Sequence, residues 1–60
     1  MINDKETGQQ LLDLLDLNQE KMIRNLVELE MSYNGGDVHV AFKWVEADMY
    51  QSYMEIIESK

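Results

Sequence analysis

The sequence predicts an α+β fold in which a helix, a β-hairpin and a second helix form one small domain that pairs into a homodimer. Three observations favour this prediction. Apolar residues recur at helical spacing near the start of the chain, apolar and polar residues alternate around an Asn-Gly-Gly-Asp sequence in the middle, and helical spacing returns near the end. The alternative is an all-α helical hairpin that dimerises into a four-helix bundle.

The length and composition of the chain limit it to a single domain. It has 60 residues, 45% of them hydrophobic, and neither cysteine nor proline. This is enough for one small domain over residues 1–60. Without cysteine and with a single histidine, a Cys/His metal site lacks its ligands. We expect no metal, no cofactor and, since neither a signal peptide nor a membrane span is evident, a cytoplasmic protein.

Residues 9–25 are expected to form the first helix. At about 100° per residue, its apolar residues fall within an arc of roughly 120°. These residues are Leu11, Leu12, Leu15, Met22, Ile23 and Leu26. An acidic face of Asp13, Asp16 and Glu20 lies opposite. Leu17 falls on the polar side, which allows a break here with Asn18 as the cap of a new helix.

The middle of the chain fits two structures. As a hairpin, residues 27–33 and 38–44 place alternate apolar side chains on one face, around a loop at residues 34–37. Glu28 then faces Lys43 as an opposite-charge pair. As helices, the two stretches continue the first helix and begin another. The Asn-Gly dipeptide and the β-branched and aromatic residues of the second stretch favour the hairpin.

Residues 46–59 are expected to form a helix with a wide apolar face. Together with Val45, its apolar residues cover an arc of roughly 200°. A helix that packs on one sheet or one other helix buries only about half of that arc. The surplus predicts a homodimer in which two hairpins, or two C-terminal helices, meet across a two-fold axis.

This C-terminal region is also where we expect a protein partner to bind. Aromatic side chains supply much of the free energy of protein interfaces, and several are concentrated here. The expected partner-binding residues are the apolar anchors Trp44, Tyr50, Tyr53 and Met54 and the charged rim Asp48, Glu55 and Glu58.

The net charge of −7 separates the functional hypotheses. It disfavours direct contact with nucleic acid or an anionic membrane, whereas rows of carboxylates can occupy a basic surface that normally binds nucleic acid. The main hypothesis is a non-enzymatic small acidic protein that binds and inhibits a protein partner, in the manner of a nucleic-acid mimic or a mobile-element accessory protein. The alternative is a structural or regulatory helical-hairpin dimer that contacts nucleic acid.

Overall fold

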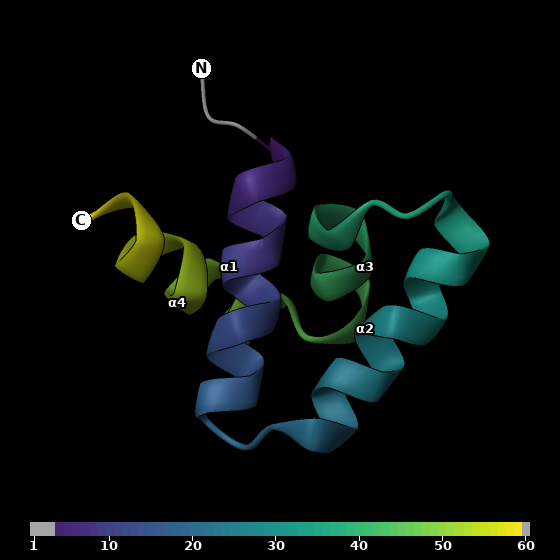
Figure 1. Ribbon diagram of the computed structural model, residues 1–60, viewed down its shortest axis with the longest axis horizontal. Helices are drawn as coiled ribbons and strands as arrows, with labels where there is room; N and C mark the ends of the chain where they lie inside the picture. Colours follow the sequence, from purple (N-terminus) through teal and green to yellow (C-terminus); the bar gives the residue numbers. More distant parts are fainter. Residues whose placement is uncertain (1–3, 60) are drawn as a thin grey trace.

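The structure, a computed structural model, describes residues 4–59. Helices account for 85% of it: α1 (Asp4–Leu17), α2 (Lys21–Asn34), α3 (Val38–Val45) and α4 (Ala47–Glu58) (Figure 1). This part of the chain contains no strand. The predicted α+β fold with a β-hairpin is therefore wrong, and the all-helical alternative fits. None of the four helices is long and apolar enough to cross a membrane.

The residues predicted to turn a hairpin instead end one helix and begin the next. Gly35 has a φ of 85° at the C-terminus of α2, and the Gly36 amide donates to the Met31 carbonyl at 2.9 Å. This left-handed cap is a common helix end and favours glycine. Asp37 then caps α3, because its side chain accepts a hydrogen bond from the amide of Val40 at 3.2 Å.

The predicted contact between Glu28 and Lys43 depended on the hairpin register and is absent. Glu28 lies 3.1 Å from Arg24, one turn earlier on α2. The ammonium group of Lys43 lies 5.3 Å from the centre of the Tyr50 ring on α4. Glu28 is therefore paired within α2 and Lys43 contacts α4, so the two side chains do not pair with each other.

The long helix predicted over residues 9–25 is divided between α1 and α2. Gln19 has a φ of 58°, and the Glu20 amide donates to the Leu15 carbonyl at 2.9 Å, which closes the end of α1. The break that the sequence allowed is therefore present. Asn18 does not cap α2, however, because its side-chain amide donates back to α1.

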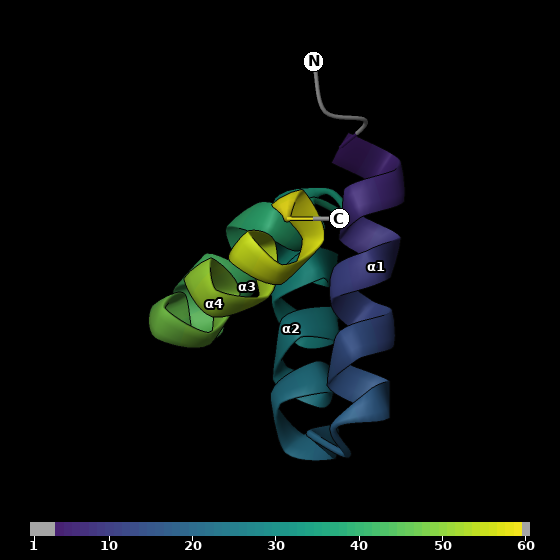
Figure 2. The same ribbon diagram turned by 90° about the vertical axis from the view of Figure 1, so that its left-hand side faces the viewer.

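The core lies where α1, α2 and α3 meet, and α4 packs on α1 and α3 (Figures 1 and 2). The buried hydrophobic residues are Leu11, Leu12, Leu15, Val27, Ala41, Phe42 and Tyr53. The fully buried ring of Phe42 meets Tyr50 and Tyr53 edge-on, each at 5.7 Å between ring centroids. The Tyr53 hydroxyl accepts a hydrogen bond from Asn18 at 3.0 Å, so this ring also joins α4 to the end of α1.

Candidate protein-binding surface

A groove beside α4 brings together four of the residues predicted to bind a partner. These four are Tyr50, Met54, Glu55 and Glu58. Lys43 of α3 lines the other side of the groove, which is open to solvent and has a volume of about 420 Å³. We call it the α3–α4 groove.

Contacts on several sides hold the aromatic ring of the α3–α4 groove. The Tyr50 hydroxyl is hydrogen-bonded to His39 Nδ1 at 2.8 Å, and its ring lies edge-on to those of His39 and Phe42. Lys43 adds a cation–π contact. Because Tyr50 is fixed in this way, the groove is a pre-formed surface, and binding does not require this ring to be ordered first.

Carboxylates form one edge of the α3–α4 groove. Glu55 and Glu58 line it and are exposed. Asp48 is also exposed and lies two helical turns before Glu55, which places it on the same side of α4. The structure shows no ion pair for these three carboxylates within residues 4–59. This edge therefore presents negative charge to solvent.

The other two predicted anchors lie elsewhere. Tyr53 is 8% exposed and belongs to the core. Trp44 is 78% exposed but does not line the α3–α4 groove. On α3 it lies about 160° from Phe42, which faces α4. The sequence identifies the apolar residues of this region, but a helical wheel cannot distinguish those that pack inward from those that face a partner.

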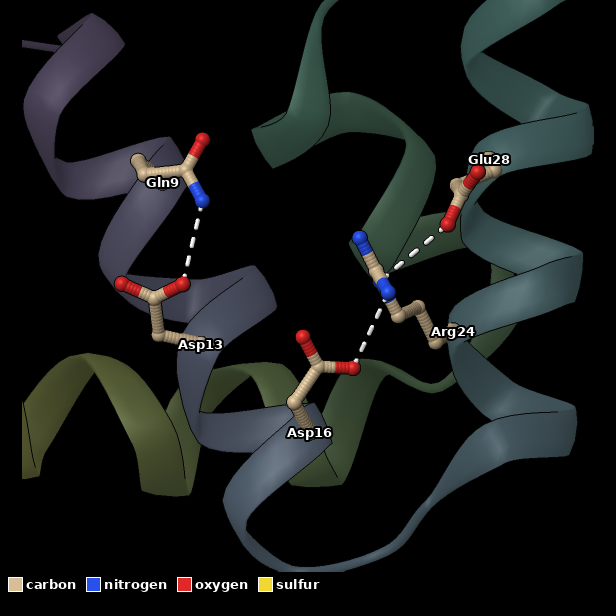
Figure 3. A network of polar contacts seen from close by, with 5 residues as sticks. All are labelled: Gln9, Asp13, Asp16, Arg24 and Glu28. Atoms are coloured by element: carbon tan, nitrogen blue, oxygen red, sulfur yellow. Dashed lines mark hydrogen bonds and ion pairs between the residues drawn. The ribbon is translucent and has the colours of Figure 1, made fainter.

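The acidic face predicted on the first helix is partly neutralised. Figure 3 shows Arg24 of α2 between two carboxylates. Its Nη1 lies 3.1 Å from Asp16, and its Nε lies 3.1 Å from Glu28 without the alignment of a hydrogen bond. Asp16 is therefore committed to a contact between α1 and α2, which reduces the negative charge that this face can offer to a partner.

The remaining acidic residues of that face differ from each other. Asp13 is exposed and accepts a hydrogen bond from the side-chain amide of Gln9 at 3.0 Å (Figure 3). Glu20 is half-buried in the turn before α2. The three carboxylates do not form a uniform row, and the α3–α4 groove is the more coherent acidic site.

Lys43 is not among the residues predicted to bind a partner, because the expected hairpin places it in a strand facing Glu28. On a helix, Lys43 lies about 100° from the neighbouring Phe42 and therefore faces a different side. This placement follows only when α3 is known to be a helix. Over residues 4–59, no cluster of three or more histidine, aspartate or glutamate side chains could hold a metal ion.

Comparisons with known proteins do not assign the chain to a class. No protein-family model matches it, and no match is found among curated proteins or solved structures. Its function must therefore be argued from its own surfaces.

Proposed function

We propose that the protein is a non-enzymatic interaction module that binds a basic segment of a protein partner in the α3–α4 groove. The observation that supports this is that apolar side chains and carboxylates line the same groove. Tyr50 and Met54 are the apolar residues and Glu55 and Glu58 the carboxylates, while Lys43 lies over one face of the Tyr50 ring. Lysine and arginine suit such a site, because their aliphatic stems pack on apolar groups while their charged ends pair with carboxylates.

Inhibition is the proposed consequence of this binding. A basic segment that also binds nucleic acid cannot do so while it occupies the α3–α4 groove. The net charge of −7 adds a long-range attraction that speeds the encounter with a basic protein. The proposed role is thus that of a small acidic inhibitor that competes with nucleic acid for its partner.

Charge reversal on two helices tests this proposal. The partner is first captured with the wild-type chain, and its affinity is then measured for the double variant Glu55→Lys, Glu58→Lys. We expect the affinity to fall by roughly tenfold or more, because both carboxylates at the edge of the groove become repulsive.

The matched control is the double variant Asp13→Lys, Glu20→Lys, which changes the net charge equally but on α1 and the following turn. It should retain most of the affinity at physiological salt. An equal loss in both variants would mean that only overall charge matters, and no loss in the first would place the partner elsewhere.

The all-helical fold favours the architecture of the second hypothesis, a helical regulator that contacts nucleic acid. Its contacts would come from Lys5, Lys21 and Lys43, which belong to three different helices, while Arg24 is already paired with Asp16. A gel-shift experiment at low salt distinguishes the two functions. Retarded DNA or RNA would support direct contact, and unretarded nucleic acid would support the protein partner.

A further inference from the structure

An uncovered row of apolar side chains runs along α2. The row consists of Met22, Leu26, Leu29 and Tyr33, which are 75%, 43%, 51% and 77% exposed. Their successive spacings of four, three and four residues are those of a coiled-coil seam, in which every such residue packs on a neighbouring helix. In the described part of the chain, α2 packs on α1 and α3 but not on α4, and the row remains exposed.

The row faces away from α1. Arg24 of α2 reaches Asp16 of α1, so α1 lies on that side of α2. On a wheel of about 100° per residue, the centre of the row lies roughly 170° from Arg24. In Figure 1, α2 forms one edge of the molecule.

Two exposed residues of α3 extend the row. Val40 and Trp44 are 38% and 78% exposed and lie one helical turn apart. Val38 of the same helix faces α1, since it lies 3.2 Å from the position of a Cβ on Gly8. Val40 lies about 160° from Val38 and therefore faces away from α1 as well.

The exposed residues of the two helices form one surface. The helices α2 and α3 pack side by side, and α1 packs against both of them (Figures 1 and 2). From the wheel positions above, the residues of α2 and α3 that face away from α1 therefore lie together on the opposite side of this pair. We call this surface the α2–α3 apolar face. It comprises Met22, Leu26, Leu29, Tyr33, Val40 and Trp44.

We propose that the α2–α3 apolar face is the interface of a two-fold symmetric homodimer in which α2 packs against α2 of a second copy. Its area supports this occupant. A fully covered aromatic residue buries about 150–250 Å², so the exposed parts of Tyr33 and Trp44 alone amount to roughly 300 Å², and the exposed parts of the four aliphatic residues add to this area. A stable interface of standard size buries about 800 Å² on each partner.

The distribution of charge also favours a second copy of the chain. Each copy carries −7, so two copies associate only if their carboxylates are kept apart. The positions that flank the seam on its outer side are the uncharged Asn25 and Ser32. Glu28 faces Arg24, and Glu30, which flanks the seam on its other side together with Ile23, is half-buried. A basic partner would find few carboxylates on this face, whereas an identical face meets little repulsion.

Sedimentation of two matched variants tests the homodimer. We expect the wild-type chain to sediment with twice its mass of 7.1 kDa at micromolar concentration. Leu29→Lys should sediment as a monomer with an unchanged far-UV circular dichroism spectrum, because Leu29 is half exposed and its replacement leaves the core intact. Ile56→Lys alters a residue of similar exposure, 45%, outside the face and should remain dimeric.

A monomeric wild-type chain, or a Leu29→Lys chain that stays dimeric, would overturn the proposal. Should Leu29→Lys unfold, Met22→Gln replaces a more exposed residue of the same face and should also dissociate the dimer. These outcomes do not depend on the α3–α4 groove, because neither variant alters it.

Trp44 provides a second measurement. It is the only tryptophan, and it lies within the proposed interface. In the dimer the emission maximum of Trp44 should lie at shorter wavelength than that of an exposed tryptophan. Dilution or the Leu29→Lys substitution should shift this maximum to the wavelength of an exposed tryptophan. An emission maximum of an exposed tryptophan at every concentration would contradict the proposal.

Discussion

The helices α1 and α2 each end near a residue with a left-handed backbone, but one of these residues is a glutamine and the other a glycine. Gln19 and Gly35 both have a positive φ, of 58° and 85°. Glycine adopts this conformation freely, whereas a residue with a Cβ is strained there by about 1–2 kcal/mol. The end of α1 therefore contains strain that the end of α2 avoids.

Substitutions at these two positions should have opposite effects. Gln19→Gly is expected to raise the free energy of unfolding by roughly 0.5–1 kcal/mol, and Gly35→Ala to lower it by about 1–2 kcal/mol. A Cβ added at Gly35 would meet no atom outside the local chain within 4 Å. The stability lost in Gly35→Ala would therefore report backbone strain alone. Urea denaturation measures both, with Gly35→Asn as the milder control. Effects of the same sign would contradict this account.

The helices themselves were partly predictable from the sequence. The helix expected over residues 46–59 corresponds to α4 (Ala47–Glu58). The hairpin was wrong because its signals are ambiguous. Asn-Gly-Gly-Asp supplies a left-handed glycine and a capping aspartate, which serve a helix–turn–helix as well as a hairpin. The β-branched residues of α3 adopt a helix because packing on α1, α2 and α4 outweighs their modest propensity.

The candidate site was predictable to the extent that it lies on one helix. Tyr50, Met54 and Glu58 fall within about 80° on a wheel of α4, and Glu55 lies about 60° beyond Glu58. The burial of each side chain was not predictable, because it depends on which side of α4 packs against α1 and α3. Met22 and Leu26 were expected on the buried face of the first helix, but the break at Gln19 ends the continuous wheel on which that expectation depended, and the structure exposes both.

The ion pair between α1 and α2 should contribute little to the stability of the helix pair. Arg24 and Asp16 are 38% and 50% exposed, and such pairs are worth about 0.2–1 kcal/mol. Arg24→Met keeps much of the apolar stem and should lower the free energy of unfolding by less than about 1 kcal/mol. The difference should shrink in high salt, which screens the pair. A larger loss that is insensitive to salt would indicate a packing role for Arg24.

At the scale of the whole molecule, the core is small relative to the apolar surface that remains exposed. The buried core consists of a single cluster, while large apolar side chains of α2 and α3 face solvent. A chain of this length is marginally stable by itself. Covering the α2–α3 apolar face would therefore link folding to association.

This linkage predicts that thermal stability depends on protein concentration. Because dimerisation stabilises the folded state by mass action, the Tm of the wild-type chain should rise as its concentration is increased. The Tm of Leu29→Lys should be lower and independent of concentration. Circular dichroism or calorimetry over a dilution series provides the measurement. A constant Tm for the wild-type chain would argue against linked folding and association.

Amide chemical shifts recorded on dilution test the central claim most directly, because they locate the contact as well as detect it. Dissociation should change the signals of α2 and α3, with the largest changes around Leu26, Leu29 and Val40, and leave those of the outer side of α4 in place. A spectrum that does not change with concentration, or changes confined to α4, would contradict the account.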